Sequence, residues 1–524
     1  MFVLTFTGMR GFPAVLAVVC SLALASACSS TESDDQAGNS VLRVVATGLA
    51  DPYEIVWGPD GFIWATEKTG KRVTRIDPAN GRKITALTIE DAVHTAGGQD
   101  GVLGLALHPD LLKGDGHDYV YVSHTYDAAT ELEEQDYRTK IVRYTYDKDK
   151  QVLGSPVDLI TGLAGGVDHQ SGKLRFGPDA KLYYTIGDQG ANQFALYCES
   201  IEAQTLPSAV QVKEEDWSAY RGKILRLNLD GSIPDDNPEF NGVRSHLYAM
   251  GFRNAQGLAF APSGLLYGTD QGPKTDDEVN LIRPGKNYGW PNVAGYQDDK
   301  AYVYAEWAKA RNGCRAETYS DYDIPLSVPQ TKESDWDDPD FAPPLVTFET
   351  VENDFNFRAA SDCLDPGTEF ICWPTLALSS LEVHPAGFLL ATSLKDGSLH
   401  RIPLTAEGKK TGTPSRVADT TDRYRDTALD PTGKTVFIAT DRAGYTRDAD
   451  GSPTLNLQHP GSILAYDLAL GALASPTGVA STTAVRVGPS GASSRIRARS
   501  SPAVSSWLTM AIGMPRAAAR ATNR

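Results

Sequence analysis

Cysteine is scarce in this chain of 524 residues, which contains six cysteines and nine histidines. None of the spacings H-x-x-H, H-E-x-x-H or C-x-x-C occurs, and this absence argues against a zinc site. The sequence also contains neither G-x-S-x-G nor G-x-G-x-x-G. The usual signatures of serine hydrolases and of nucleotide-binding domains are therefore excluded.

Positive charge is also in short supply, because 49 Lys and Arg residues face 66 Asp and Glu residues and the formal net charge is -17. Binding to nucleic acid rests largely on basic residues that neutralise phosphates. The charge balance therefore argues against a nucleic-acid partner, and an anionic ligand would need a local basic cluster. The composition, 41% hydrophobic and 22% charged, is that of a globular protein with a large core.

Long hydrophobic runs are confined to the N-terminus, and no later run is long enough to span a bilayer. Residues 1–28 contain one early arginine, an apolar run and small residues ahead of Cys28. This pattern predicts an export signal with a lipobox-like end, in which Cys28 is lipidated. Ala25 stands where Leu is most usual, so an ordinary cleaved signal is the alternative. The polar residues 29–40 predict a tether, and the protein is expected in the periplasm or at the cell surface.

Four cysteines remain after the signal, and export permits disulfides between them. Cys363 and Cys372 lie close together with Pro and Gly between them, which predicts a small disulfide-closed loop. Cys198 and Cys314 form a possible second pair, but the sequence does not decide this pairing.

A short phrase recurs six times: a turn containing proline, then an apolar and aromatic run ending in Thr, Ser or Gly. Such turns followed by β-branched and aromatic residues favour strands. The copies begin at Gly58, His108, Gly177, Ala261, His384 and Asp430. Helical periodicity is nearly absent. Six similar units predict an all-β, six-bladed β-propeller over residues 41–468, because a radial array leaves only short, protected sheet edges.

Unequal spacing of the copies predicts long loop insertions, particularly between Leu281 and Leu381, and long ordered loops are usually functional. Residues 469–524 are rich in Ser, Ala, Thr and Gly and contain arginines but no acidic residue. We predict that this tail is disordered. A basic arm resting on anionic lipid or cell-wall polymer is the alternative.

Four basic residues, Arg253, Lys395, Arg423 and Arg425, lie within a few residues of a repeat strand. Because inter-blade loops converge on one face of a propeller, these side chains are expected near one rim. Arg423 and Arg425 are two residues apart, which on an extended segment directs both to the same side. Arg binds carboxylate or phosphate with two parallel hydrogen bonds, so the set indicates a polyanionic small ligand. Ordinary surface ion pairs are the alternative.

The segment after the fourth copy is dense in oxygen donors. It contains the backbone carbonyls of Gly272 and Pro273 and the carboxylates of Asp277, Glu278 and Asp298. Hard cations such as Ca²⁺ take six to eight oxygen ligands with flexible geometry. The spacing is not that of an EF-hand, so the residues alone indicate a candidate calcium loop.

The stretch GVDHQSGKLRFGPDAKLYYTIGDQG places His169, beside Asp168, before one predicted strand and Asp188 after the next. A histidine near two carboxylates is a candidate for a catalytic site. This stretch alone, however, favours a solvated loop, because His, Asp, Gln and Gly are all common in loops.

Several blocks closely resemble the soluble quinoprotein glucose dehydrogenases of the glucose/sorbosone dehydrogenase family. They are GGQDGVLGLALHPD, DHQSGKLRFGPDAKLYYTIGDQG, GKILRLNLDGSIPDDNP, GFRNAQGLAF, DQGPKTDDEVNLI, NYGWPNVAGY, ICWPT and RYRD. These enzymes are six-bladed propellers that carry pyrroloquinoline quinone (PQQ). The resemblance covers roughly Val41 to Tyr466 and leaves out the signal and the tail.

The resemblance implies oxidation of the anomeric C1 of glucose or a related aldose to the lactone, with electrons passed to an external acceptor. It implies that His169 is the general base for the anomeric hydroxyl and that Asp188 holds the imidazole. The implied substrate contacts are Gln99, Asp168, Gln193 and Trp373. The implied cofactor contacts are Gln99, Arg253, Asn254, Gln256, Gln271, Trp373, Thr375, Lys395, Arg423 and Arg425.

The same resemblance implies two calcium regions and a homodimer. Gly272 and Pro273 match the carbonyl ligands of the cofactor-bound calcium. The second region, which supports the dimer, matches Glu278, Tyr288, Ala294, Tyr296, Asp298 and Glu333. These implications agree with the residues themselves. PQQ has three carboxylates, which suit the Arg and Lys set, and calcium acts as a Lewis acid on the quinone. A carboxylate partner fixes the tautomer of a histidine base.

The chain departs from the family pattern near the substrate. Phe370 stands where the family's glucose enzyme has Tyr, Phe194 replaces a Leu, and residues 198–212 also differ. These changes bear on which sugar fits. Two rival functions are a calcium-dependent lactonase-type hydrolase on the same architecture and a catalytically inactive propeller that binds surface sugars.

Overall fold

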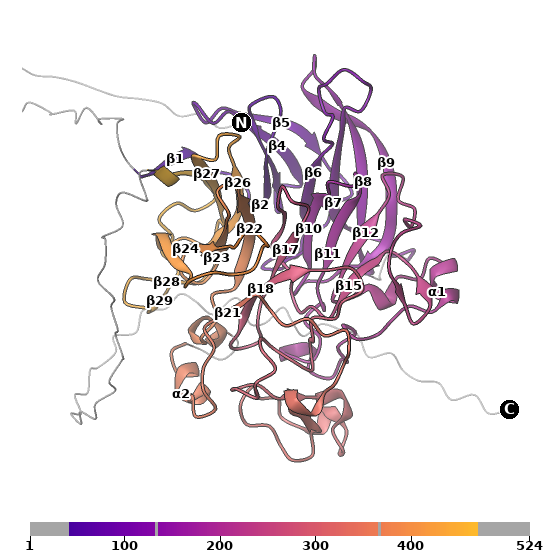
Figure 1. Ribbon diagram of the computed structural model, residues 1–524, viewed down its shortest axis with the longest axis vertical. Helices are drawn as coiled ribbons and strands as arrows, with labels where there is room; N and C mark the ends of the chain where they lie inside the picture. The colour runs from indigo at the N-terminus through magenta and orange to yellow at the C-terminus, as the bar shows by residue number, and fades with distance from the viewer. Residues whose placement is uncertain (1–40, 132–134, 365–367, 470–524) are drawn as a thin grey trace, which may run out of the picture. The chain divides into compact units, whose positions relative to one another are not determined.

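The computed structural model describes residues 41–131, 135–364 and 368–469. Within these residues the chain forms six four-stranded antiparallel sheets, as the six copies of the sequence phrase predict. The six-bladed β-propeller is therefore confirmed (Figure 1). The predicted signal with Cys28, the tether, and the tail beyond residue 469 lie outside the described residues.

The first three blades are built from strands in chain order. In the third blade, a separate pair of short strands lies in the connection before the last strand. Blade 1 contains β2 (Pro52–Trp57), β3 (Ile63–Glu67), β4 (Arg72–Ile76) and β5 (Lys83–Thr88). Blade 2 contains β6 (Val102–Leu107), β7 (Tyr119–Asp127), β8 (Tyr137–Asp147) and β9 (Val152–Ala164). Blade 3 contains β10 (Ser171–Phe176), β11 (Leu182–Ile186), β12 (Lys223–Leu227) and β15 (Leu247–Met250).

Blades 4 and 5 are also built from strands in chain order, whereas blade 6 is completed by a strand from near the N-terminus. Blade 4 contains β16 (Leu258–Phe260), β17 (Leu266–Asp270), β18 (Asp277–Ile282) and β21 (Val346–Phe348). Blade 5 contains β22 (Leu378–His384), β23 (Phe388–Ser393), β24 (Ser398–Pro403) and β25 (Ser415–Asp419). Blade 6 contains β26 (Tyr424–Leu429), β27 (Thr435–Thr440), β30 (Ile463–Asp467) and β1 (Leu42–Ala46).

The remaining elements are short and lie in the connections. Two-stranded pairs are β13 (Glu239–Phe240) with β14 (Val243–Arg244), β19 (Tyr304–Ala305) with β20 (Gln330–Thr331), and β28 (Thr446–Arg447) with β29 (Pro453–Thr454). The α-helices are α1 (Ala209–Lys213) and α2 (Phe357–Ser361). The 3-10 helices are η1 (Phe194–Leu196), η2 (Ser218–Tyr220), η3 (Trp307–Lys309), η4 (Cys314–Ala316), η5 (Glu333–Asp335) and η6 (Glu369–Cys372). No helix of the described residues is long and apolar enough to cross a membrane.

The ring of blades closes through its innermost and outermost strands. Each innermost strand contacts the innermost strand of the next blade, in the order β2, β6, β10, β16, β22, β26 and back to β2. The N-terminal strand β1 completes blade 6 by pairing with β30, with Leu42 opposite Tyr466. Two distant parts of the chain thus close the ring, and β1 covers the edge of β30.

Each repeated phrase forms the turn between the first and second strands of a blade. In blade 3, for example, Gly177 donates a backbone hydrogen bond to Lys181 at 2.9 Å, and Asp179 accepts from the Tyr183 hydroxyl at 2.9 Å. Proline and a short polar residue set the turn, and the following apolar run becomes the second strand. The phrase therefore marks one blade each time it occurs.

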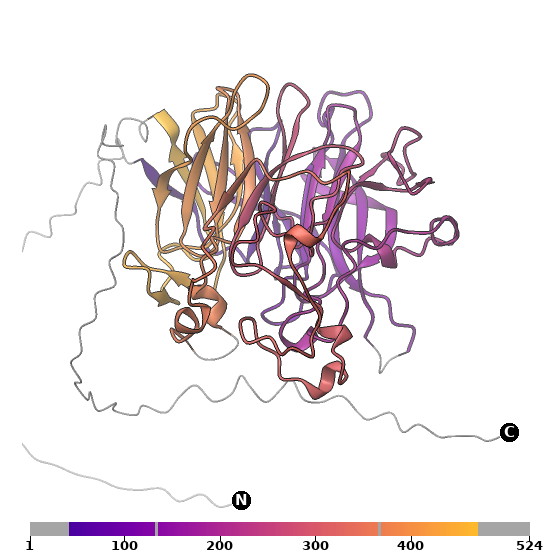
Figure 2. The same cartoon turned by 60° about the horizontal axis from the view of Figure 1, so that its bottom comes forward.

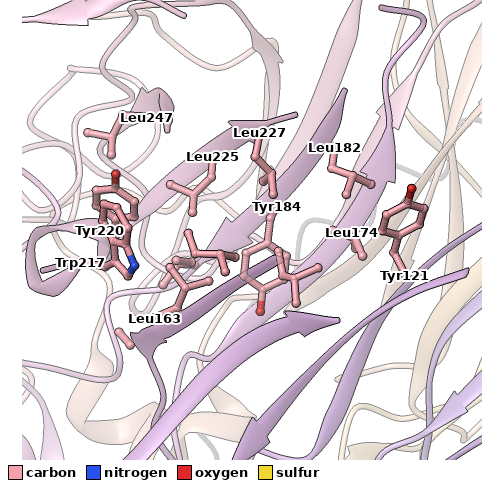
Figure 3. Packing of buried hydrophobic residues seen from close by; sticks show 14 of the residues in the cluster. Tyr121, Leu163, Leu174, Leu182, Tyr184, Trp217, Tyr220, Leu225, Leu227 and Leu247 are labelled. Carbon is pink, nitrogen blue, oxygen red and sulfur yellow. The ribbon is translucent and has the colours of Figure 1, made fainter. Parts of the chain in front are cut away.

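The core lies between neighbouring blades, where both faces of each sheet are covered. Figure 3 shows the cluster between blades 2 and 3, in which Tyr121, Leu174, Tyr184 and Leu225 are fully buried. Burial on both faces explains why the second strands are continuous apolar runs instead of alternating ones.

Long insertions gather on one side of the propeller. They connect β11 to β12, β18 to β21 and β21 to β22, and carry α1, α2 and η1 to η6. In Figures 1 and 2 the insertions that carry α2 and the short helices between β18 and β21 project together below the blades. Two disulfides, Cys198–Cys314 and Cys363–Cys372, tie these insertions.

Candidate active site

The loops at one end of the blades surround a cavity of about 590 Å³. Most of the residues that the sequence singled out line it: Gln99, Asp168, His169, Gln193, Arg253, Gln256, Gln271, Gly272, Pro273, Trp373, Thr375, Lys395, Arg423 and Arg425. The volume lies in the range of small-molecule sites. Residues far apart in the sequence thus meet around one space, as the propeller prediction requires.

Strand direction explains why these residues meet. The first strand of a blade starts at the end of the propeller where the second strand finishes, so that Ser171 of β10 pairs with Ile186 of β11. His169 therefore precedes one strand, Asp188 follows its neighbour, and the two lie together. Gly187 permits this approach, because a Cβ there would come within 1.9 Å of the His169 carbonyl oxygen.

His169 and Asp188 form a hydrogen-bonded pair behind the cavity wall. The Nδ1 atom of His169 lies 2.7 Å from Oδ1 of Asp188. Asp188 is itself held, because its Oδ2 accepts from the Trp290 indole at 2.8 Å and its Oδ1 from the Gly190 amide at 2.9 Å. A carboxylate opposite Nδ1 places the ring proton there and leaves the Nε2 lone pair free to accept a proton.

Gln193 and Asp168 lie beside the Nε2 atom of His169, and Gln99 binds Asp168. The amide nitrogen of Gln193 lies 3.2 Å from Nε2 of His169 and donates to Oδ2 of Asp168 at 2.8 Å. Gln99 donates to Oδ1 of Asp168 at 2.8 Å. Burial raises the pKa of Asp168, but His169, Arg253 and the hydrogen bonds from His169 and Gln193 outweigh burial and hold that pKa below its ordinary value. Asp168 is therefore an ionised acceptor beside the base.

Arg253 presents an unsatisfied donor at the cavity. Its guanidinium donates to Gln193 Oε1 at 2.8 Å and lies 5.6 Å from the ring centre of Trp290. Its buried Nε atom has no hydrogen-bond partner among the described residues. Asn254 lies behind the wall and donates to Gln271 at 3.0 Å while accepting from Gln256 at 3.0 Å. An unpaired guanidinium nitrogen fits an anionic ligand that supplies the missing acceptor.

Arg423 and Arg425 share a single carboxylate, that of Asp441. Arg425 donates to both oxygens of Asp441 at 2.7 Å, and Arg423 donates to Oδ2 at 3.0 Å. Burial raises the pKa of Asp441, but Arg425 and then Arg423 outweigh it, so the pKa lies below its usual range. Two cations on one anion leave net positive charge at the cavity, which suits a ligand with several carboxylates.

Lys395 completes the basic wall from the turn between β23 and β24. Its Nζ atom donates to the Thr375 hydroxyl and to the Phe370 carbonyl, and lies 3.4 Å from the Trp373 carbonyl. Burial and the positive charge of Arg447 hold the pKa of Lys395 well below its ordinary value. The lysine therefore fixes the loop that carries Trp373 while lining the cavity.

Gly272 and Pro273 line the cavity between these basic groups. The Gly272 amide donates to Oδ1 of Asp277 at 2.9 Å, and the amide of Ala377 donates to Oδ2 of Asp277 at 2.8 Å. Asp277 is thus engaged by backbone amides and positions the loop. The carbonyl oxygens of Gly272 and Pro273 are hard donors of the kind that calcium takes.

The second predicted calcium region is a separate acidic cluster around residues 294–299. Glu278 accepts from the Gly295 amide at 2.7 Å, and Glu333 accepts from the Ala294 and Asp298 amides at 3.0 and 3.2 Å. Burial raises the pKa of Glu333 to about 7. Tyr296 lies in this loop, whereas the Tyr288 side chain packs on Phe252 and donates to the Leu281 carbonyl at 2.7 Å.

An orphaned acid beside this cluster fits a cation. Asp276 is buried, and its Oδ2 atom has no hydrogen-bond partner among the described residues. Burial raises its pKa to about 6, and the nearby Asp298 carboxylate adds to the rise. Unpaired buried carboxylate oxygens are costly unless a cation compensates them.

Sequence reasoning missed four residues that build the site. Trp290 fixes Asp188, Asp441 joins the two arginines, Asp276 supplies an unpaired oxygen, and Lys68 lines the cavity with its Nζ 2.9 Å from the Gly98 carbonyl. Asp441 directly follows the strand of the sixth copy, which ends at Thr440, so its position in the sequence could have identified it. The other three have no distinctive local pattern.

Two phenyl rings line the same cavity as His169. Phe194 and Phe370 both line the cavity, with ring centres 6.4 Å apart in an edge-on arrangement. Phe194 precedes Cys198, which is bonded to Cys314, and Phe370 lies inside the loop closed by Cys363 and Cys372. The two disulfides thus tie the loops that present the two rings.

Known proteins share this architecture. The Glucose / Sorbosone dehydrogenase family matches residues 49–323. Quinoprotein glucose dehydrogenase B of Acinetobacter calcoaceticus is 42% identical over 436 residues, which cover 81% of this chain and 90% of that protein. Among solved structures, the PQQ-bound aldose sugar dehydrogenase of Streptomyces coelicolor is 25% identical with a TM-score of 0.54, over 81% of this chain and 96% of that one.

A second solved structure has a similar fold. A putative oxidoreductase (glucose dehydrogenase) from Thermus thermophilus is 25% identical with a TM-score of 0.55, over 81% of this chain and 98% of that one. The family match and the 42% identical relative both cover most of the propeller. The chain belongs to the glucose/sorbosone dehydrogenase family.

Proposed function

We propose that this protein is a PQQ- and calcium-dependent dehydrogenase that oxidises C1 of glucose or a related aldose to the lactone. The observation that carries the proposal is the meeting, in one cavity, of an oriented histidine base and a wall of Arg and Lys residues. The 42% identity to a quinoprotein glucose dehydrogenase supports the same activity.

His169 acts as the general base. Its Nε2 atom takes the proton of the C1 hydroxyl, and the imidazolium that forms is stabilised by the Asp188 carboxylate at Nδ1. Trp290 and Gly190 keep that carboxylate in place, so the ring does not turn during proton transfer. PQQ, when bound, would supply the acceptor for the C1 hydride, and calcium would supply a Lewis acid beside it.

Asp168, Gln99 and Gln193 orient the sugar. The Gln193 amide now occupies the position beside Nε2 of His169 that a substrate hydroxyl would take. A sugar hydroxyl there donates to Nε2, and a neighbouring hydroxyl donates to the ionised Asp168. Trp373 supplies an apolar wall, since it is buried and lines the cavity.

The basic wall holds the carboxylates of the cofactor. Arg423 and Arg425 form one positive centre around Asp441, and Arg253 with its unpaired Nε forms another. Lys395 and Thr375 complete the cradle, and Gln256 and Gln271 offer side-chain amides. Gly272 and Pro273 are the calcium ligands next to the cofactor.

The second acidic cluster holds further calcium and supports a homodimer. Glu278, Glu333 and Asp298 gather around one loop, and Asp276 contributes an unpaired oxygen. The enzyme would need an external electron acceptor, which we propose is a quinone, a cytochrome or a dye. The two disulfides are typical of an exported protein, and we place the enzyme in the periplasm or at the cell surface, anchored through Cys28.

The lactonase-type hydrolase is the weaker candidate, because hydrolysis gives no role to a wall of Arg and Lys beside an oriented histidine. An inactive sugar-binding propeller is weaker still, since it does not need the His169–Asp188 pair. The deciding experiment adds PQQ and Ca²⁺ to purified apoprotein and follows dye reduction by glucose, with hydrolysis of gluconolactone measured in parallel. Dye reduction that needs both additions supports the proposal, and hydrolysis without dye reduction supports the hydrolase.

A further inference from the structure

A second cavity, of about 430 Å³, lies at the other end of blades 2 and 3 from the active site. It lies near the turn after β6 and the turn after β12, whereas the active-site loops precede β6 and β12. Its lining residues are His108, His117, Tyr119, Tyr121, Arg143, Asn228, Leu229 and Asp230. None of these residues has a role in the proposed dehydrogenase reaction.

Three hydrogen-bond donors at this cavity have no protein acceptor among the described residues. The hydroxyl of Tyr121 is fully buried and unpartnered. The guanidinium of Arg143 lies 4.4 Å from the ring centre of Tyr119 and makes no hydrogen bond or ion pair with the described residues. Arg143 and Tyr121 are direct cross-strand partners, so both donors belong to one patch of blade 2.

His108 supplies the third donor. Its Nδ1 atom accepts from the Asp110 amide at 3.1 Å, so the neutral ring carries its proton on Nε2. Burial and then the neighbouring His117 hold the pKa of His108 below its ordinary value, which favours this neutral form. The side chain is 8% exposed and lines the cavity, and its Nε2–H finds no acceptor among the described residues.

The walls of the cavity are flat rings. His108 and His117 stack with ring centres 5.1 Å apart, and Tyr119 and Tyr121 lie against the same imidazole. Figure 3 shows Tyr121 at the edge of the apolar cluster between the blades. Asp230 also lies at the cavity, and its Oδ1 atom accepts from the amide and hydroxyl of Ser232 at 3.0 and 2.6 Å.

We propose that this cavity is a second ligand site, which binds a small oxyanion, a carboxylate or phosphate carried on a planar body. Arg143 supplies the charge, since a guanidinium binds either group with two parallel hydrogen bonds. Tyr121 supplies a buried neutral hydroxyl, which is costly to leave unpaired, and His108 supplies a neutral Nε2–H at the cavity wall.

The test uses the holoenzyme, in which the cofactor fills the basic cavity on the opposite face. Isothermal titration with inorganic phosphate, acetate and benzoate distinguishes the two anion chemistries and the contribution of a planar body. Saturable binding of at least one probe is expected, with benzoate tighter than acetate because of the ring walls. Absence of saturable binding by all three overturns the proposal.

Two variants locate the binding. Arg143→Gln and Tyr121→Phe are each expected to weaken it by about ten- to a hundredfold, because a hydrogen bond to a charged group is lost. Tyr121→Phe removes a hydroxyl that has no partner among the described residues, so its melting temperature should stay equal or rise. Arg401→Gln is the matched control, since Arg401 lies 4.2 Å from the Phe388 ring centre in blade 5. Anion binding that is the same in both variants and the control contradicts the site, whatever the dehydrogenase assay shows.

Discussion

The Nδ1 atom of His169 lies 2.7 Å from the Oδ1 atom of Asp188, at the adjoining ends of two neighbouring strands of blade 3. Nineteen residues of sequence separate the two side chains, and the hairpin between β10 and β11 brings them together. The pair leaves Nε2 of His169 directed at the cavity, where a base is needed.

Loss of the base should stop the chemistry and spare cofactor binding. We expect His169→Gln to lower turnover by about 10²- to 10⁴-fold, the usual contribution of a general base. Asp188→Asn should also lower turnover, because an amide that donates to Nδ1 places the ring proton on Nε2. Steady-state dye reduction measures both effects, and PQQ titration serves as the control. Turnover within a few-fold of the wild type in His169→Gln would reassign the base.

The arginine pair should determine cofactor affinity. Arg423→Ala and Arg425→Ala each remove a charge-assisted donor, so PQQ binding should weaken by about ten- to a hundredfold. Excess PQQ should restore part of the activity. Arg423→Lys should also weaken binding, because a point charge replaces a planar fork.

The control for this pair is Arg416→Ala, which removes an arginine of β25 that is paired with Asp396 and Asp419 away from the cavity. Activity recovery at increasing PQQ concentration measures each protein. Curves for Arg423→Ala and Arg425→Ala that overlay the Arg416→Ala curve would show that the pair does not hold the cofactor.

Calcium should stabilise the fold more strongly as pH rises. Burial raises the pKa of Asp276 to about 6 and of Glu333 to about 7. A carboxyl group whose pKa is raised in the folded state stabilises the protein in its protonated form. This stabilisation is complete below the pKa of the unfolded state, about 4, and it is lost as the pH rises through the pKa of the folded state. Calcium binds the ionised form and must displace these protons.

We therefore expect a larger increase in melting temperature on adding calcium at about pH 7.5 than at about pH 5. The melting temperature is measured with and without chelator at both pH values. The difference between the two at one pH removes the contribution of the other titrating groups. Glu278→Gln should reduce the increase at the higher pH. An increase of equal size at both pH values would place calcium away from these acids.

The aromatic wall should select the sugar without affecting the cofactor. Phe370→Tyr adds a hydroxyl at the cavity and Phe194→Leu removes a ring. We expect ratios of kcat/KM between aldoses to change by roughly tenfold, since one such group in a pocket contributes about that much discrimination. PQQ titration curves should remain those of the wild type. Unchanged ratios across a panel of aldoses would place the sugar elsewhere in the cavity.

Much of the architecture follows from local sequence. Each blade repeats the same turn and apolar strand, so six copies are enough to predict six sheets and the end at which their loops meet. His169, Asp188 and the arginines lie next to these copies, and for this reason sequence reasoning placed them near one rim. The family resemblance supplied their proposed roles.

The remaining parts depend on contacts that no local pattern encodes. Trp290 reaches Asp188 across 102 residues, and the Cys198–Cys314 disulfide spans 116 residues. Asp441 was visible as the end of a repeat, but its bond to two arginines requires blade 6 to be folded. The unpaired donors of Tyr121 and Arg143 likewise become apparent only when blades 2 and 3 pack together.

The central claim is that C1 of an aldose loses a hydride while His169 removes the hydroxyl proton. Stopped-flow absorbance of the PQQ- and calcium-loaded enzyme, mixed with glucose and no acceptor, follows reduction of the bound cofactor directly. The account predicts rapid reduction that slows when C1 carries deuterium, and loss of this phase in His169→Gln with the cofactor still bound. Reduction at an equal rate with deuterated glucose and in His169→Gln, or no reduction at all, would contradict it.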